Sequence, residues 1–221
     1  MIKAVIFDLD GLLINSEMIY YQIEVDFLKT YGHTITLEEY AHNNSGKTLV
    51  KNVTYMVNQY QIPLSVEEGL SFVMAREKEY FSKGVPLKPG ATELLHFLKD
   101  NHYRIIMASS STRERAEGVL ARNQILSFFD DMVFGPEISN GKPHPEIFLK
   151  ASEKAKEPPQ NCLVLEDSEA GIQAAYAAKI PVICIPDLKI PDQKYQDMAT
   201  RLLPSLSDVI PFIREDSLSG Q

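Results

Sequence analysis

Five short runs of apolar, largely β-branched residues constrain this chain more than any other feature. The first, residues 2–7, is bounded by Asp and Gly and has the length of one buried strand. Helical patterns lie between the later runs, at residues 91–101, 113–123, 145–156 and 168–179. Strands that alternate with helices of this length predict βαβ units and a parallel sheet. The other four predicted strands are residues 104–108, 132–134, 162–165 and 182–185.

Residues 16–85 break this alternation. They hold no convincing strand, and turn residues such as Gly32, Pro63 and Gly84 divide them into helices at 17–31, 37–43, 48–60 and 66–82. The sequence therefore predicts an α/β core formed by residues 1–15 and 86–221, with an all-helical domain inserted at residues 16–85. The last residues, 215–221, are expected to fray.

Composition narrows the class of protein. The chain is 44% hydrophobic and 24% charged, as in an ordinary globular protein, and no apolar run is long enough to span a membrane. A net charge of −8 argues against a nucleic-acid-binding surface. Residues 2–7 are too short for a signal peptide, and Cys162 and Cys184 lie inside apolar runs. We therefore expect two buried free thiols in a cytoplasmic protein.

Two carboxylates, Asp8 and Asp10, follow the first predicted strand. In open α/β sheets, ligands bind at the loops beyond the carboxyl ends of the strands. Neighbouring carboxylates repel each other unless a cation or a proton lies between them. Such a pair can hold Mg²⁺, or can act as a nucleophile and a general acid/base. The alternative is an Asx turn in which both acids are solvated.

Other strand ends carry further polar groups. The hydroxyl cluster at residues 109–112 opens a helix and could bind an anion, although simple helix capping would also explain it. Lys142 stands between Gly141 and Pro143, which limits the directions of its ammonium, although a single lysine is often only a surface charge. Glu166 and Asp167 could complete the cation site. Asp167 or Ser168 could instead simply cap the next helix, but one cap suffices, so capping does not explain both acids. Together these groups match the needs of phosphoryl transfer.

Four motifs resemble those of one enzyme family. They come in the family's order and span nearly the whole chain: DLDGLLINSE at 8–17, ASSS at 108–111, GKPHPEIF at 141–148 and LEDSEAGI at 165–172. In these motifs the chain resembles hydrolases of the haloacid dehalogenase (HAD) superfamily, in the β-phosphoglucomutase-like branch. The resemblance implies a Rossmann-like parallel-sheet core with a helical cap inserted after the first strand, in agreement with the segmentation above.

The resemblance also implies roles for individual residues. Asp8 would be the nucleophile that forms an aspartyl-phosphate, and Asp10 the general acid and then the general base. Ser109 and Lys142, with Ser110 beside Ser109, would bind the phosphoryl group. Mg²⁺ would be held by Asp8, the backbone carbonyl of Asp10, and Asp167, with Glu166 nearby.

Departures from the mutase pattern bear on the substrate. The position of Asn15 is commonly Asp in mutases, and a His usually stands where Tyr20 falls. The mutase cap carries an Arg just after the loop glycine, whereas this chain reads Gly46-Lys47-Thr48. These differences favour a phosphatase. The three loop residues are expected to select the substrate, although Lys47 could be only a solvated charge at a helix start.

The sequence thus predicts a Mg²⁺-dependent phosphatase of a small phosphorylated metabolite, with a sugar phosphate as the favoured class. The alternative activity is a phosphomutase of the β-phosphoglucomutase type. A more remote alternative is a binding protein that holds a phosphorylated metabolite without catalysis. Neither nucleic acid nor a membrane is expected as a partner. We expect a monomer, with a dimer as the alternative.

Overall fold

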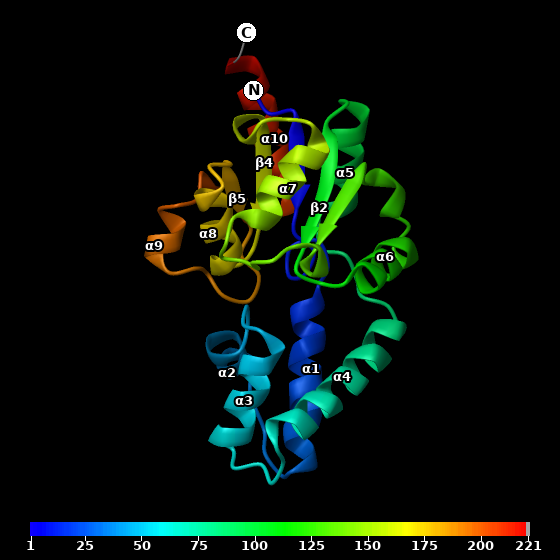
Figure 1. The fold of residues 1–221 in the computed structure, drawn as a ribbon, viewed down its shortest axis with the longest axis vertical. Helices are drawn as coiled ribbons and strands as arrows, with labels where there is room; N and C mark the ends of the chain where they lie inside the picture. The colour runs from blue at the N-terminus through cyan, green and yellow to red at the C-terminus, as the bar shows by residue number, and fades with distance from the viewer. Residues whose placement is uncertain (220–221) are drawn as a thin grey trace. The chain divides into compact units, whose positions relative to one another are not determined.

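The computed structural model describes residues 1–219 and divides into two compact units, Met1–Asn15 with Pro86–Gln221, and Ser16–Val85 (Figure 1). A six-stranded parallel sheet forms the centre of the first unit, in the order β3-β2-β1-β4-β5-β6. Its strands are β1 Ala4–Phe7, β2 Arg104–Ser109, β3 Asp131–Phe134, β4 Cys162–Glu166, β5 Val182–Cys184 and β6 Arg201–Leu202.

Helices cover the sheet because its strands are apolar on both faces. The helices α7 Glu146–Ala155 and α8 Glu169–Ala177 cover one face, where Ile6 and Val164 belong to the same buried cluster as Phe148 and Ile172 (Figure 1). The helix α5 Ala91–Asp100 packs on β2 and on α10 Val209–Ser219. The remaining elements of this unit are α6 Arg113–Arg122, α9 Gln193–Gln196, and the short 3-10 helices η1 Leu126–Phe128, η2 Gly135–Glu137, η3 Pro159–Asn161 and η4 Leu206–Asp208.

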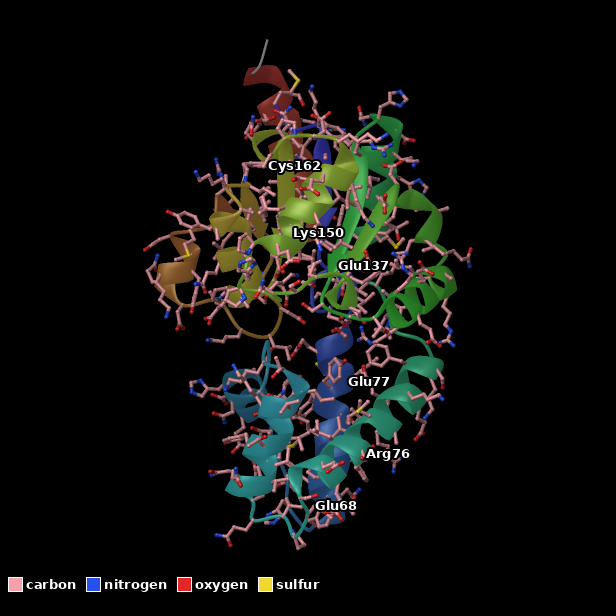
Figure 2. The ribbon with its side chains drawn as sticks, viewed as in Figure 1. Glu68, Arg76, Glu77, Glu137, Lys150 and Cys162 are labelled. Carbon is pink, nitrogen blue, oxygen red and sulfur yellow. The ribbon has the colours of Figure 1, made fainter. Side chains whose placement is uncertain are left out.

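In the second unit, Ser16–Val85, the regular elements are the four helices α1 Ser16–Thr30, α2 Leu37–Asn43, α3 Leu49–Gln59 and α4 Val66–Ser82, joined by short loops. Capping boxes start two of the helices: Thr36 with Glu39 begins α2, and Ser65 with Glu68 begins α4. Glu68 is labelled in Figure 2. In each box the hydroxyl accepts from a backbone N–H three residues later, while the glutamate accepts from the cap's own N–H. Polar residues thus fix where these helices begin.

The predicted α/β class, with a parallel sheet and an inserted helical segment, is confirmed. The strand β6 and the short helix α9 were not predicted. The fraying expected from residue 215 is wrong as far as Ser219, because α10 continues to that residue; residues 220–221 lie outside the described part. Both cysteines are buried and free as predicted, and burial raises the pKa of Cys162 to about 11 and of Cys184 to about 12. Among residues 1–219 no helix combines the length and the apolar character needed to cross a bilayer.

A buried carboxyl group ties three elements of the helical unit together. Glu24 of α1 accepts from Asn44 Nδ2 at 2.6 Å and from Asn52 Nδ2 at 3.2 Å, and Asn52 also donates to the carbonyl of Asn44 at 3.0 Å. Burial raises the pKa of Glu24 to about 8, although the amides oppose the shift. The Oδ1 atoms of Asn44 and Asn52 are buried and meet no hydrogen-bond donor among residues 1–219. The cluster anchors the start of the loop that leads to Lys47.

We expect Glu24→Gln to raise stability at alkaline pH. The folded pKa of Glu24 lies above its unfolded value, so its stabilising contribution is complete below about pH 4.5 and is lost as pH rises through about 8. The new amide stays neutral, and either asparagine can turn its own amide to accept from it. The free energy of unfolding is measured by urea denaturation with circular dichroism. The difference between variant and parent should rise in favour of the variant by ~2–4 kcal/mol from about pH 5 to about pH 8.

The matched control is Glu68→Gln, in the same unit. Backbone and side-chain hydrogen bonds from Ser65 lower the pKa of Glu68, so this substitution should produce no such gain. A difference between Glu24→Gln and the parent that does not change with pH would contradict the assignment of a neutral, buried Glu24.

Candidate active site

Three polar side chains leave the sheet at one edge. Asp8 follows β1, Ser109 ends β2 and Glu166 ends β4, and these strands are neighbours in parallel register. The N–H of Asp8 donates to the carbonyl of Leu165 at 3.1 Å, which continues the ladder one residue beyond β1. All three side chains are buried. The sheet therefore brings together residues that are far apart in the sequence.

Lys142 joins two of these carboxylates. Its Nζ lies 2.5 Å from Asp8 Oδ1 and 2.6 Å from Glu166 Oε1, with the Phe148 ring centroid 4.9 Å away. The side chains of Lys142, Asp8 and Glu166 are 8%, 9% and 1% exposed. Two carboxylates thus share a single ammonium inside the protein. Such an arrangement favours a further cation or a proton at the site.

The pKa values of Asp8 and Lys142 are shifted by burial and by the charges around them. Burial raises the pKa of Asp8 to about 7; Lys142 opposes the shift and the nearby Glu166 adds to it. Burial alone would lower the pKa of Lys142, but the charges of Asp8 and Glu166 outweigh it and hold that pKa above its ordinary value. Lys142 is therefore a permanent cation beside a nucleophile candidate that sits in a dry environment.

Glu166 is fully engaged with protein donors. Its Oε1 accepts from Lys142, while its Oε2 accepts from the N–H groups of Asp167 and Ser168 at 3.0 Å each and from Ser168 Oγ at 2.9 Å. A Cβ on Gly171 would lie 1.8 Å from the carboxyl carbon of Glu166, so only glycine lets α8 approach this closely. Glu166 fixes the position of Lys142 and the start of α8.

The loop that carries Lys142 is held by Glu146. The carboxylate of Glu146 accepts from the N–H groups of Ser139 and Asn140, at 2.9 Å each. These bonds, with the nearby Lys150, lower the pKa of Glu146 to about 2. Glu146 is the first residue of α7, so the loop is fastened to the helix that follows it.

Asp10 is held by an arginine that the sequence prediction missed. Arg115 Nη1 lies 2.9 Å from Asp10 Oδ2 and Nη2 lies 2.7 Å from Asp10 Oδ1, and Nη1 also donates to Ser111 Oγ at 2.9 Å. Arg115 comes from the first turn of α6, whose N-cap is Thr112. The one feature of the sequence that could have pointed to Arg115 is its position, shortly after the hydroxyl-rich end of a predicted strand. In other respects it looks like an ordinary polar residue of a helix.

The serines of the hydroxyl cluster at residues 109–112 differ in burial and in their hydrogen bonds. Ser109 is buried, and its Oγ accepts from the N–H of Ser111 at 3.1 Å, which shapes the turn into α6. Ser110 is exposed. The predicted roles of Ser109 and Ser110 in phosphate binding stay predictions.

Asp167 lies against the loop that carries the two aspartates. Gly11 has a φ of 83°, and a Cβ there would lie 2.3 Å from Asp167 Oδ2. Among residues 1–219 no three acidic, histidine or cysteine side chains form a complete metal cage. Mg²⁺ seldom needs one, because it binds one or two carboxylates and keeps water or phosphate oxygens in its shell. The carboxylates of Asp8 and Asp167, at one edge of the sheet, fit that requirement.

The loop residues of the helical unit are exposed, and each has a local role. Thr48 caps α3, accepting from the N–H of Lys51 at 3.4 Å, and Gly46 is open to solvent. The ammonium of Lys47 donates to the carbonyl of Asn43, the last residue of α2. A cation is favourable at a helix C-terminus. The end of α2 therefore supplies a partner for the charge of Lys47, which precedes α3.

Comparisons with known proteins decide the family. Residues 5–185 match the model of the haloacid dehalogenase-like hydrolases. The chain belongs to this family. It is 33% identical over 178 residues to a phosphorylated carbohydrates phosphatase of Thermotoga maritima, covering 80% of this chain and 82% of the relative. It is 30% identical over 187 residues to hexitol phosphatase B of Escherichia coli, covering 84% of each.

Solved structures agree with this assignment. A HAD family hydrolase from Deinococcus radiodurans, with bound phosphate and sodium, has a TM-score of 0.84 at 26% identity, covering 98% of this chain and 97% of its own. A β-phosphoglucomutase from Clostridium difficile has a TM-score of 0.76 at 25% identity, covering 97% and 96%. The family and the phosphoglucomutase-like branch predicted from the motifs are confirmed.

The Lys142 cluster leads to a prediction about stability. Lys142→Met removes the one ammonium between Asp8 and Glu166 and leaves two buried carboxylates. We expect the free energy of unfolding at neutral pH, measured by urea denaturation, to fall by ~3–5 kcal/mol, the usual cost of a buried charge without its partner.

Lys150→Met is the control for this measurement. Lys150 lies on the same loop–helix segment (Figure 2) and pairs with Glu146 at 3.1 Å, but its side chain is 41% exposed. Its removal should change stability by no more than about 1 kcal/mol. A Lys142→Met variant as stable as Lys150→Met would contradict the buried ion cluster.

Proposed function

We propose that this protein is a Mg²⁺-dependent phosphatase that hydrolyses a small phosphorylated metabolite, with a sugar phosphate as the favoured class. The observation that carries the proposal is the buried Asp8 carboxylate, held by Lys142 at the end of β1, with Asp10 two residues further on. Two of the relatives are named a phosphorylated carbohydrates phosphatase and a hexitol phosphatase, which supports this substrate class.

Each step is assigned to residues of this chain. An Asp8 carboxylate oxygen attacks phosphorus, and the bond from phosphorus to the ester oxygen breaks as the Asp8–phosphorus bond forms. Asp10 gives its proton to the leaving alkoxide. It then takes a proton from water, which attacks phosphorus and frees Asp8 and inorganic phosphate. Lys142, with Ser109 and Ser110, binds the phosphoryl oxygens.

The metal is proposed from the donors at the sheet edge. Asp8, Asp167 and the backbone carbonyl of Asp10 would hold Mg²⁺, and Glu166 would keep Lys142 beside them. Bound Mg²⁺ neutralises charge on the phosphoryl group during transfer. Without it, the surplus negative charge of Asp8 and Glu166 would oppose an approaching phosphate.

The helical unit is proposed to select the leaving group. Gly46, Lys47 and Thr48 are exposed and stand on a loop anchored by Asn44 in the Glu24 cluster. Lys47 is the one of the three with a charge that a polar or anionic substrate group could use. Its bond to the Asn43 carbonyl is the competing, purely structural role.

The nucleophile is tested with Asp8→Asn. An amide cannot form the acyl phosphate, so release of inorganic phosphate from a panel of phosphorylated sugars should fall by at least ~10⁴-fold. Asp100→Asn, on the exposed end of α5, serves as the control and should keep parental activity. Turnover by Asp8→Asn within a few-fold of the parent would refute the mechanism.

The same assay tests the metal. Activity should disappear in EDTA and return when Mg²⁺ is added back, and Asp167→Ala should need more Mg²⁺ than the parent for half-maximal rate. Full activity of the parent in chelator would remove the metal from the mechanism.

One further assay separates hydrolysis from isomerisation. β-Glucose 1-phosphate is supplied with catalytic glucose 1,6-bisphosphate, and glucose 6-phosphate and free phosphate are followed together. Free phosphate should dominate, because the loop offers Lys47 and no arginine for a second phosphate. Rapid formation of glucose 6-phosphate with little phosphate release would identify a mutase instead.

A further inference from the structure

Asp10 meets a second cationic centre, separate from Lys142. The Arg115 guanidinium contacts both oxygens of the Asp10 carboxylate, at 2.7 and 2.9 Å, in the bidentate form. The same Nη1 that contacts Asp10 also donates to Ser111 Oγ at 2.9 Å, which gives the guanidinium a third contact. The side chain of Arg115 is 19% exposed and that of Asp10 is 28% exposed. The pair is thus partly exposed, whereas Asp8, two residues earlier in the chain, is buried.

The three partners come from different parts of the fold. Asp10 stands in the turn after β1, Ser111 in the loop after β2, and Arg115 on α6. The helix α6 is fixed at its start by Thr112, whose hydroxyl accepts from the N–H of Arg115 itself. The guanidinium therefore connects the turn that follows β1 to the helix that follows β2. A lysine could reach one oxygen but could not fix the plane of the carboxylate.

The bidentate contact with Arg115 limits the further hydrogen bonds that the Asp10 carboxylate can accept. Each carboxylate oxygen has two acceptor directions, and the bidentate pair uses one on each oxygen. The remaining directions are available for a leaving oxygen or a water. A carboxylate without such a fork can rotate about its own bonds and would spend much of its time pointing away from the phosphoryl group.

We infer that Arg115 is a positioning residue for Asp10: with Ser111 it sets the orientation in which Asp10 exchanges a proton with the leaving group and then with water. This inference rests on the proposed phosphatase function and adds to it a residue outside the four family motifs. When Asp10 carries the proton, one oxygen turns its O–H to the leaving oxygen and the other keeps its bond to Arg115.

The test compares two leaving groups. Glycerol 2-phosphate has an alkoxide leaving group that needs a proton, whereas the nitrophenolate of p-nitrophenyl phosphate does not. The ratio kcat/KM covers the steps up to release of the leaving group, before the aspartyl-phosphate is hydrolysed. Arg115→Met should lower kcat/KM by ~30-fold or more on glycerol 2-phosphate and by less than ~3-fold on p-nitrophenyl phosphate. Arg115→Lys should fall between the parent and Arg115→Met.

A double-mutant cycle ties the effect to Asp10. In the Asp10→Asn background, Arg115→Met should change kcat/KM on glycerol 2-phosphate by less than ~2-fold, since there is no proton donor left to orient. The matched control is Arg113→Met on the same helix. Arg113 pairs with Glu117 and with Glu137 of η2 (Figure 2), and its loss should leave both substrates within ~2-fold of the parent.

Other outcomes of these assays would overturn the inference or the proposed function. Equal losses on both substrates, or a full effect of Arg115→Met in the Asp10→Asn background, would overturn the inference and make Arg115 a phosphate-binding or purely structural residue. A parent that hydrolyses glycerol 2-phosphate no faster than Asp10→Asn does would also overturn it. A parent that releases phosphate from neither of these two substrates nor from any member of the panel of phosphorylated sugars would overturn the proposed function, and the inference would fall with it.

Discussion

The contact of one buried ammonium with two carboxylates is the interaction on which the rest of this site depends. Lys142 lies within 2.6 Å of both Asp8 and Glu166, at the ends of two neighbouring parallel strands. Burying three charges costs several kcal/mol per ion, and only close pairing and further hydrogen bonds offset that cost. The fold provides both: Glu166 receives three more donors from the start of α8, and Glu146 fastens the loop that presents Lys142. Hydrogen bonds at the site therefore hold the starts of α7 and α8, in addition to the apolar contacts that pack these helices on the sheet.

Close packing at two glycines explains why these groups can meet. Gly171 lets α8 lie directly against the Glu166 carboxyl group, and Gly11 lets the turn after β1 approach Asp167. A side chain at either position would collide with a carboxylate within 2.3 Å. The approach concentrates negative charge at one edge of the sheet, which Lys142 only partly balances. Such a surplus of negative charge is the electrostatic setting that a divalent cation or another electrophile would neutralise.

Much of this arrangement could be predicted from the sequence, and the reasons are specific. The strands β1 and β4 are continuous apolar runs because helices cover both faces of the sheet, and parallel strands end at one edge, so Asp8, Ser109 and Glu166 had to lie near each other. The strand β6 escaped prediction because it has only two residues, Arg201–Leu202, and neither is buried. The partners of a long side chain are set by tertiary structure: sequence patterns could place Lys142 at the site but could not show that it bridges two acids. Arg115 was missed for the same reason, since its spacing resembles that of any surface arginine on a helix.

The two aspartates of the DLDG turn end up in different surroundings, and this difference is what their proposed roles require. Asp8 is buried, touches an ammonium that is itself buried, and has a pKa raised to about 7 by desolvation. Asp10 is partly exposed and is held through both oxygens by a guanidinium that α6 and Ser111 keep in place. A nucleophile gains from a dry site with one fixed cation, whereas a proton carrier needs contact with the leaving group and with water. Two residues of the same type, with one residue between them, can thus divide the work because the turn places one beside the buried Lys142 and the other beside Arg115 of α6.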